Sequence, residues 1–513
     1  MTNSIQLRVD PRTAATPELL AKEVAREMGV SPSEIKDITI LKRSIDARQR
    51  RVMINLTVAP CALADGLQPA TIDYQPLKGG EPDVVVVGAG PAGLFAALGL
   101  IERGIRPILL ERGKDVDSRR RDMARIAREN IIDPDSNYCF GEGGAGAYSD
   151  GKLYTRSKKR GSVEKILNIL HQHGADRDIL VDAHPHIGTD RLPGIIKAIR
   201  ETIIRCGGIV RFETKVTGLI VSEKGDVVQG VVTADGTQYH GPVILATGHS
   251  ARDVYEFLDT QGIELQAKGL AVGVRLEHPQ HLIDCIQYHS PQGRGKYLPA
   301  AEYSMLTRVD GRAVYSFCMC PGGFIIPASS APGQLVVNGM SPSNRGTRWS
   351  NSGMVVEVLP EDVPGDDPLR MIDFQKSIEL RFFADGDGTQ NAPAQRMADF
   401  VNSRPSENLP ATSYAPGIHP ARIDHLLPKP IASRLQKGFA EFGRKSRGFL
   451  TNDAVLIGCE TRTSSPVRIP RDNDSLQHVA ISGLYPCGEG AGYAGGIVSA
   501  AIDGDRIAAI INV

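Results

Sequence analysis

Residues 83–113 read DVVVVGAGPAGLFAALGLIERGIRPILLERG, and this stretch decides the fold. Its apolar, β-branched run from Val84 to Val87 suits a strand that is buried on both faces. Three glycines follow in G-x-G-x-x-G spacing, and a helix is expected to start near Pro91. A second strand, Ile108 to Leu110, ends at Glu111. Strand, turn, helix, strand and terminal acid therefore occur in the order of a βαβ unit that binds a dinucleotide.

Each residue type in this unit has a mechanical reason. Gly88 permits the tight turn, Gly90 lets the backbone approach a pyrophosphate, and Gly93 lets the helix pack on the strand. The helix N-terminus offers free N–H groups and a partial positive charge to that anion. An acid at position 111 accepts a hydrogen bond from a ribose hydroxyl and argues against a 2′-phosphate, so FAD or NAD is predicted. The predicted contacts here are Gly88, Ala89, Gly90, Pro91, Ala92, Gly93, Glu111 and Arg112.

The same glycine pattern occurs twice more, without the elements that make it specific. After Gly141, Gly143 and Gly146 the chain continues as SDGKLYT rather than as an amphipathic helix. After the third copy, which starts at Gly490, too little chain is left for another βαβ unit. Because only the first copy is complete, one dinucleotide is expected to bind stably, and NAD(P)H, if it is the electron donor, would bind transiently.

The charge balance argues against a polyanionic partner. The 513 residues hold 59 Lys plus Arg and 59 Asp plus Glu, so the net charge is zero. This balance provides no general attraction to nucleic acid or to an anionic membrane, and the basic clusters 119–121 and 158–160 are interpreted as solvated surface. The uncharged run 84–101 is interrupted by glycines and a proline, so no membrane span is expected. The start, MTNSIQLRVD, has no signal-peptide pattern, and a cytoplasmic location is expected.

The eight cysteines form no C-x-x-C pair and no zinc-type set with histidine, so neither a standard dithiol relay nor a metal site is predicted. Cys318 and Cys320 alternate along VYSFCMC and should lie on one face of a strand. Ordinary packing is the favoured interpretation of this pair, with a redox or metal role as the alternative.

Four segments are predicted. Residues 1–78 form a small β-α-β-β module, with a capping box in SPSE at 31–34. This module is interpreted as a docking or dimerisation unit, and its basic stretch at 42–51 leaves a substrate or partner role open. Residues 79–264 and 451–513 form the two parts of the nucleotide-binding domain. Residues 265–450, rich in strands and in Pro and Gly turns, form an inserted domain that closes over the cofactor and selects the substrate.

Two further glycine-rich segments are expected at the cofactor. In NYCFGEGGAGAYSDGKLYT, residues 137–155, the backbone of Gly143, Gly144, Ala145 and Gly146 could approach the pyrophosphate and flavin; a flexible surface loop is the alternative. Near the end, LYPCGEGAGYAGGIVSAA is a strand, a turn and a helix, with Gly488, Glu489, Gly495, Gly496 and Ile497 as predicted contacts. A helix dipole aimed at this point favours an anionic reduced flavin.

These motifs, with CETRTSSPVRI and VYSFCMCPGGFIIPAS, resemble the uncharacterised bacterial FAD-dependent dehydrogenase family, a branch of the two-dinucleotide-binding-domain flavoproteins. The resemblance spans nearly the whole chain. It implies bound FAD and an α/β fold: a Rossmann-like FAD-binding domain of glutathione-reductase type, an inserted β-rich α+β substrate domain, and a small N-terminal βαββ module. It also implies that Thr247 and Gly248 lie under the cofactor, that Val216 lies near the adenine, and that Glu489 replaces the usual Asp.

The sequence thus predicts a FAD-dependent oxidoreductase, a dehydrogenase or reductase of a small molecule, with two-electron transfer through flavin N5. Lys152, Glu460 and Arg462 are the candidate substrate-side groups, and for each a salt bridge or cofactor contact is the alternative. One competing hypothesis is a geranylgeranyl-reductase-like enzyme that reduces double bonds of a lipid or isoprenoid. The other is a flavin-binding scaffold or RNA-modification factor recruited through the N-terminal module. The electron donor stays open, as does oligomer formation.

Overall fold

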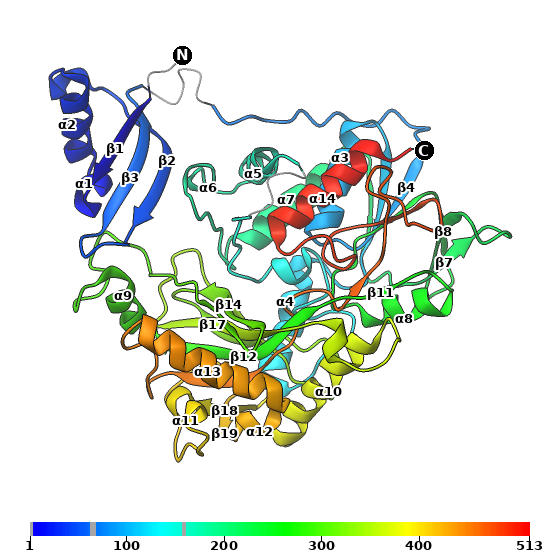
Figure 1. Ribbon diagram of the computed structural model, residues 1–513. Helices are drawn as coiled ribbons and strands as arrows, with labels where there is room; N and C mark the ends of the chain where they lie inside the picture. Colours follow the sequence, from blue (N-terminus) through cyan, green and yellow to red (C-terminus); the bar gives the residue numbers. More distant parts are fainter. Residues whose placement is uncertain (1–3, 62–67, 156–160, 513) are drawn as a thin grey trace.

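The computed structural model describes residues 4–61, 68–155 and 161–512. The predicted basic cluster at 158–160 lies outside the described residues, as do the first three residues of the chain. Figure 1 shows three parts: a small N-terminal sheet with its helices, an α/β part around α3 and α14, and a second, β-rich part.

The α/β part is built on a five-stranded parallel sheet in the order β22-β10-β4-β5-β6. Val84 and Val86 of the central strand pack into one core cluster and Val85 and Val87 into another, so that strand is buried on both faces, as predicted. The strands are β4 (Asp83–Val87), β5 (Arg106–Leu110), β6 (Ile209–Arg211), β10 (Val243–Leu245) and β22 (Leu484–Pro486).

Helices and a small sheet cover the two faces of this parallel sheet. One face packs against α3 (Pro91–Glu102), α7 (Leu192–Arg205) and α14 (Ile497–Ile510). The other packs against α8 (Arg252–Thr260) and an antiparallel sheet of β7 (Val216–Val221), β8 (Val228–Thr233) and β9 (Gln238–His240). The strand-like segments 215–221 and 227–234, which flank the turn residues 223–226, predict a hairpin, and the antiparallel pairing of β7 with β8 confirms it. Other helices of this part are α4 (Val116–Glu129), α5 (Val163–Gln172) and α6 (Asp178–Val181).

The β-rich part is a mainly antiparallel seven-stranded sheet in the order β13-β14-β17-β12-β20-β18-β19. Its strands are β12 (Leu270–Pro279), β13 (Leu306–Val309), β14 (Arg312–Cys320), β17 (Trp349–Val358), β18 (Ala392–Arg396), β19 (Ile418–Pro420) and β20 (Val455–Glu460). The two-stranded sheets are β15 (Phe324–Pro327) with β16 (Val337–Met340), and β11 (Gln266–Ala267) with β21 (Val467–Arg468). Its helices are α9 (Gln280–Tyr288), α10 (Arg370–Asp385), α11 (Met397–Val401), α12 (Ile423–Leu426) and α13 (Lys429–Lys445), with the 3₁₀ helix η3 (Pro360–Asp362).

The seven-stranded sheet bears on two predictions. β20 pairs with β12 and β18, so a boundary at residue 450 would separate this strand from its own sheet. The prediction that Cys318 and Cys320 alternate on one face of a regular strand is wrong. The register of β14 shifts between Phe317 and Cys320, and Cys318 has the left-handed φ of +45°, so a bulge interrupts the alternation.

The N-terminal residues form a separate three-stranded antiparallel sheet, β1-β3-β2, with its own apolar core. The elements are β1 (Ile5–Val9), α1 (Pro11–Ala15), α2 (Pro17–Met28), β2 (Thr39–Asp46) and β3 (Met53–Ala59). The capping box at Ser31 is present, but it starts only a single 3₁₀ turn, η1 (Pro32–Glu34). Arg43 on β2 forms ion pairs with Asp178 (2.8 Å) and Asp182 (2.6 Å), which fasten this unit to the α6 region.

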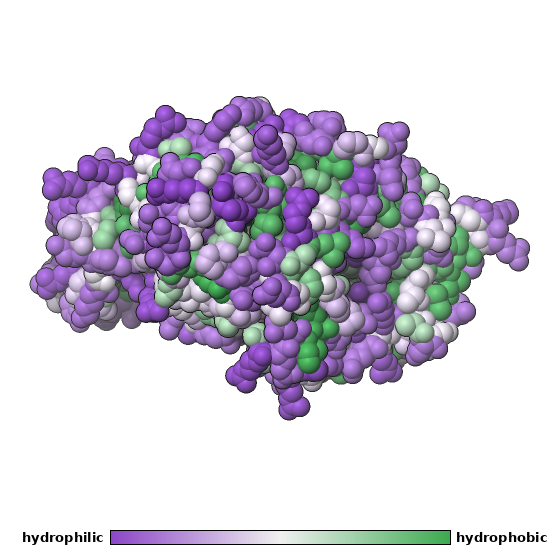
Figure 2. All heavy atoms as spheres, turned by 90° about the horizontal axis from the view of Figure 1, so that it is seen from below, coloured by the Kyte–Doolittle hydropathy of each residue, from purple (hydrophilic) through white to green (hydrophobic). Residues whose placement is uncertain are grey.

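Within the described part of the chain, no helix is long and apolar enough to cross a membrane. Figure 2 shows a face on which hydrophilic side chains predominate and apolar side chains occur in separate groups.

Candidate cofactor and substrate site

A cavity of about 360 Å³ lies at the carboxyl ends of the parallel strands. The segments after β4, β5, β10 and β22 all contribute to its wall, which is where ligands bind in open α/β sheets. The β-rich part supplies another portion of the wall through Phe317 and Cys318 of β14 and Asn338 of β16. The cavity is therefore bounded by both large sheets.

Most of the predicted cofactor contacts line this cavity. They are Gly88, Gly90, Pro91, Ala92, Glu111, Arg112, Gly144, Ala145, Gly146, Val216, Thr247, Gly248, Glu489, Gly495, Gly496 and Ile497. Ala89, Gly93, Gly143 and Gly488 belong to the same turns without lining the cavity. Of the three candidate substrate-side residues, Lys152 and Arg462 line it and Glu460 does not.

The fingerprint glycines are required for two different reasons. A Cβ on Gly93 would lie 1.9 Å from the carbonyl oxygen of Gly88, so a side chain there would push α3 off the turn. Gly88 has φ +103°, and its Cβ would lie 2.5 Å from the carbonyl oxygen of Ala246. A Cβ on Gly90 would meet nothing within 4 Å, because it would project into open space at the cavity wall. This open space at the start of α3 fits a pyrophosphate that approaches the backbone closely.

Glu111 ties the end of β5 to two turns. Its carboxylate accepts hydrogen bonds from the backbone N–H groups of Ala89 (2.8 Å), Gly113 (2.9 Å) and Gly141 (3.0 Å). A carboxylate has about four acceptor positions, so capacity for a ribose hydroxyl remains.

The glycine-rich loop is fastened to the fingerprint turn and to α4. The N–H of Gly143 donates to the carbonyl oxygen of Ala89 (2.8 Å), and the loop then forms the 3₁₀ helix η2 (Gly144–Gly146). The fully buried guanidinium of Arg119 donates to the carbonyl oxygens of Asn137 (2.7 Å), Glu142 (2.6 Å) and Gly144 (3.1 Å). Arg119 thereby holds the loop in shape, which is a packing role rather than the solvated position expected from its basic cluster.

The start of α14 lines the cavity beside the start of α3, against which α14 packs. The N–H of Gly488 donates to Asp503 Oδ2 (2.8 Å), and Asp503 forms a buried ion pair with Arg471. Pro91 at the start of α3 and Ile497 at the start of α14 both line the cavity. Two helix N-termini therefore direct partial positive charge toward the cavity, which favours a bound anion.

The polar groups near the β-rich wall come from the segment after the glycine loop. Lys152 Nζ lies 3.8 Å from Asp150 Oδ2, and Asp150 also pairs with Arg345 (2.7 Å). Burial opposes ionisation of Asp150, but Arg345 and Lys152 lower its pKa below the usual value. Lys152 thus brings an amino group to the cavity, and the carboxylate beside it, Asp150, is shared with Arg345.

Arg462 is held by a buried carboxylate. Its guanidinium pairs with Glu379 (3.1 Å), which also pairs with Arg252 (2.8 Å). Burial opposes ionisation of Glu379, yet Arg462 and Arg252 lower its pKa to about 2. Further hydrogen bonds to Ser330 and Gln334 leave Arg462 as a residue that shapes the cavity wall.

Glu460 lies behind the cavity wall. It is 2% exposed and forms a buried ion pair with Arg275 (3.2 Å), which is completely buried. Burial raises the pKa of Glu460 to about 7, despite the attraction of Arg275. Glu460 therefore forms a salt bridge, the alternative predicted for it from the sequence, and does not line the cavity where a ligand would bind.

Sequence reasoning did not single out several residues of the wall. Phe140 lines the cavity, and the Arg112 guanidinium carbon lies over its ring, 4.5 Å from the ring centroid. His249 also lines the cavity, 3.6 Å from Glu489. Phe140 and His249 adjoin motifs that were recognised, so proximity in sequence was an available signal. Phe317 lies within VYSFCMCPGGFIIPAS, one of the segments that carry the family resemblance, and Asn338 follows that segment, but nothing in either pattern indicates that these side chains face the cavity.

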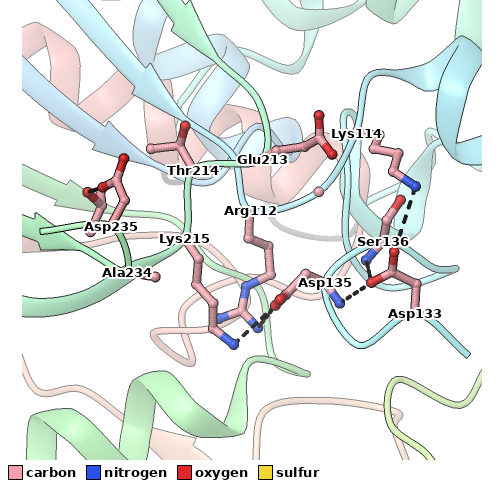
Figure 3. A pocket seen from close by; sticks show the side chains of 12 residues that line it. Arg112, Lys114, Asp133, Asp135, Ser136, Glu213, Thr214, Lys215, Ala234 and Asp235 are labelled. Atoms are coloured by element: carbon pink, nitrogen blue, oxygen red, sulfur yellow. Dashed lines mark hydrogen bonds and ion pairs between the residues drawn. The ribbon is translucent and has the colours of Figure 1, made fainter. Parts of the chain in front are cut away.

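A second pocket of about 370 Å³ adjoins the cavity and shares Arg112 and Thr214 with it (Figure 3). Figure 3 shows Lys215 directed toward Asp135, at 3.1 Å, and Lys114 toward Asp133, at 3.7 Å. Its charges are therefore largely paired. Among the described residues, no group of three or more His, Cys, Asp or Glu side chains could hold a metal ion.

Comparison with known proteins defines the class. Residues 81–125 match the model of a FAD binding domain family, and residues 269–463 match that of a family described as FAD-dependent protein, C-terminal domain-like. Residues 1–60 match a domain of unknown function (DUF8436). The protein is a FAD-containing flavoprotein of the oxidoreductase class, and the predicted cofactor is confirmed.

The particular family follows from a relative along the whole chain. An uncharacterised protein of Clostridium beijerinckii is 39% identical over 99% of this chain and 97% of its own length, and this chain belongs to the same family. The 6-methylpretetramide 4-monooxygenase of Streptomyces rimosus is 31% identical, over 31% of this chain and 36% of its own.

Two solved structures illustrate more distant likeness. CtdE in complex with FAD is 10% identical, covering 84% of this chain and 83% of its own, with a TM-score of 0.32. A geranylgeranyl bacteriochlorophyll reductase-like protein of Thermoplasma acidophilum is 12% identical, covering 84% and 78%, with a TM-score of 0.33. Likeness at these TM-scores gives no information about substrate.

Proposed function

We propose that this protein is a FAD-dependent dehydrogenase or reductase that moves two electrons between flavin N5 and a small polar molecule. The observation that carries the proposal is the single cavity bounded by the FAD-binding turns and by the β-rich sheet. The glycine turns at residues 88–93 and 141–146 would hold the cofactor, together with Glu111. Bound FAD would supply the redox chemistry, and the protein supplies position and charge.

The residues of the cavity support an electrostatic role for the protein. The N-termini of α3 and α14 place partial positive charge at its wall, which would stabilise negative charge on a bound group. Lys152, next to Asp150, would orient an anionic or hydrogen-bonding part of the substrate. Asn338 adds an amide to the same wall.

Lys152 and Asn338 support a polar substrate, whereas the apolar Phe140, Phe317 and Ile497 in the same wall keep the isoprenoid double-bond reductase as the second candidate. The N-terminal module gives little support to an RNA-binding role. Of the five basic residues at 42–51, Arg43 pairs with Asp182 and Arg48 with Asp46, which neutralises two of the charges that a cationic face would need. We infer that the module is a docking unit. The inserted substrate domain would end after β20 rather than at residue 450, since that strand belongs to its sheet.

Stopped-flow absorbance under anaerobic conditions tests the proposal. The FAD-loaded protein is mixed with NADH or NADPH, and the flavin band is followed. Rapid bleaching would support a reductase driven by a pyridine nucleotide. Bleaching only by a small polar substrate, at a rate reduced about tenfold or more in Lys152→Gln, would support a dehydrogenase. Lys296→Gln, at an exposed position, is the control. A flavin that no nucleotide and no small polar molecule reduces or reoxidises would contradict the proposal.

A further inference from the structure

Two cysteines meet at the bulge of β14, at the wall of the cavity. Cys318 lines the cavity and is partly exposed, whereas Cys320 is completely buried behind it. Neither is in a disulfide, and the Cys320 thiol donates to the backbone carbonyl oxygen of Cys318 (3.4 Å). Cα atoms two residues apart are separated by at most roughly 7 Å. The Cα atoms of two cysteines joined by a disulfide are about 4.4–6.8 Å apart. Cys318 and Cys320 can therefore form a disulfide where the chain between them is less than fully extended.

The backbone at this point departs from an ordinary strand. Cys318 adopts φ +45°, a conformation that residues with a side chain seldom adopt. The bulge that contains it places Cys318 opposite no regular partner on β17. Strained backbone of this kind recurs at functional sites, where the surrounding structure maintains it.

A buried guanidinium lies beside the two cysteines, and Lys152 lines the same cavity as Cys318. The fully buried Arg275 donates to Cys320 Sγ (3.4 Å) and to the carbonyl oxygen of Cys318 (2.7 Å). The interaction with Cys320, together with Lys152 and Arg275, lowers the pKa of Cys318 to about 5, against the effect of burial. The same interaction raises the pKa of Cys320 well above its usual value, and burial adds to this effect. The nearby carboxylates are Asp150, which pairs with Arg345, and Glu460, which pairs with Arg275.

Two other buried cysteines, Cys459 and Cys487, have no second thiol beside them in the part of the chain that the structure describes. Burial raises the pKa of Cys459 and of Cys487 well above the usual value, as expected for thiols that only fill space. The packing interpretation therefore suits those two residues and does not explain Cys318, whose surroundings favour the thiolate.

We propose that Cys318 and Cys320 form a redox-active dithiol pair in the cavity wall, in which Cys318 attacks small-molecule disulfides and Cys320 resolves the mixed disulfide. Their exposure sets this order, because only the sulfur on the cavity side can meet a substrate. The cluster of Arg275 and Lys152 supplies the positive charge that a nucleophilic thiolate requires.

The two steps balance. The Cys318 thiolate attacks one sulfur of the substrate disulfide, a mixed disulfide forms, and one substrate thiolate leaves. Cys320 gives its proton to that thiolate and attacks the Cys318 sulfur, which forms the Cys318–Cys320 disulfide and releases the second substrate thiolate. The pair is oxidised by two electrons, and the small-molecule disulfide is reduced to one thiol and one thiolate.

Alkylation of the FAD-loaded protein with iodoacetamide tests the nucleophile. Peptide mapping measures the rate at each cysteine at pH 6 and pH 8, with N-acetylcysteine as the reference. The reference rate should rise roughly 75-fold between these pH values, following its thiolate fraction. The Cys318 rate should change by less than about twofold, because the thiolate already predominates at pH 6. Cys285, a partly exposed thiol that does not line the cavity, reports general reagent access.

Incubation with oxidised glutathione tests the pair. The wild type should form the Cys318–Cys320 disulfide, Cys320→Ser should stop as a glutathione mixed disulfide at Cys318, and Cys285→Ser should behave as the wild type. A wild-type protein in which Cys318 follows the reference pH profile, or forms no disulfide with Cys320, overturns the inference; these measurements need no variant that folds. Neither test depends on turnover or on flavin reduction, so the pair can fail while the proposed function stands.

Discussion

Glu111 Oε2 accepts a hydrogen bond from the backbone N–H of Ala89 at 2.8 Å, which joins the end of β5 to the fingerprint turn after β4. The acid at the end of the second strand was predicted to bind a ribose. In the structure it also determines the shape of the turn itself, because its other oxygen accepts from Gly113 and Gly141.

Replacing Glu111 with Gln should therefore weaken both the fold and cofactor binding. The amide would turn a donor toward at least one of the three backbone N–H groups, which costs about 1–3 kcal/mol of unfolding free energy. FAD affinity should fall by about tenfold or more. Urea unfolding and fluorescence titration of the FAD-free protein measure the two effects. Glu256→Gln, at an exposed position, should change neither.

The glycines at positions 90 and 93 should separate binding from folding. Gly93→Ala places a Cβ 1.9 Å from the Gly88 carbonyl oxygen, so the FAD-free protein should lose several kcal/mol of stability, about 3 or more. In Gly90→Ala the new Cβ meets nothing within 4 Å, so the free energy of unfolding should stay within about 1 kcal/mol of the wild-type value. The same Cβ occupies space that the pyrophosphate needs, so FAD should bind far more weakly. Equal losses of stability in the two variants would contradict this account of the cavity.

Arg119 should determine the conformation of the glycine-rich loop, although it does not line the cavity itself. Arg119→Lys cannot reach the carbonyl oxygens of Asn137, Glu142 and Gly144 together, because an ammonium lacks the fork of the guanidinium. We expect FAD affinity to fall by about tenfold and proteolysis at residues 137–146 to accelerate. Arg121→Lys, on the exposed side of the same helix, is the matched control and should leave both quantities unchanged.

Glu379 should make stability depend on pH in the acid range. Its pKa in the folded protein is about 2, below the usual 4.5, so the stability it contributes is present above about pH 4.5 and is lost as the pH falls toward 2. Glu379→Gln should lower the unfolding free energy at pH 7 by about 3–5 kcal/mol, because Arg462 and Arg252 lose their buried partner.

Urea unfolding at pH 7, 5 and 4 measures this dependence. The difference between wild type and Glu379→Gln should shrink as the pH falls. A difference that is constant over this range would mean that Glu379 is not the titrating group. Glu361→Gln, at an exposed position, should follow the wild type at every pH.

The N-terminal half of the site could be predicted from the sequence in some detail. The turn at residues 88–93 and the hairpin at 215–234 each depend on residues close together in the chain. The prediction that Cys318 and Cys320 lie on one face of a regular strand was wrong because it used the local pattern alone. Strict alternation in VYSFCMC predicts a regular strand, and a bulge of one residue leaves no trace in such a pattern.

By itself, the sequence determined that this protein binds a dinucleotide, FAD or NAD, through a βαβ unit, because the spacing of glycines, apolar residues and the terminal acid is set by local geometry. Only the tertiary structure decided which distant residues face the cofactor. Lys152, Cys318 and Arg462 meet at one cavity, while Glu460 turns away to Arg275. Such neighbours depend on how a seven-stranded sheet packs against a parallel one, and that packing is a property of the whole core rather than of any short motif.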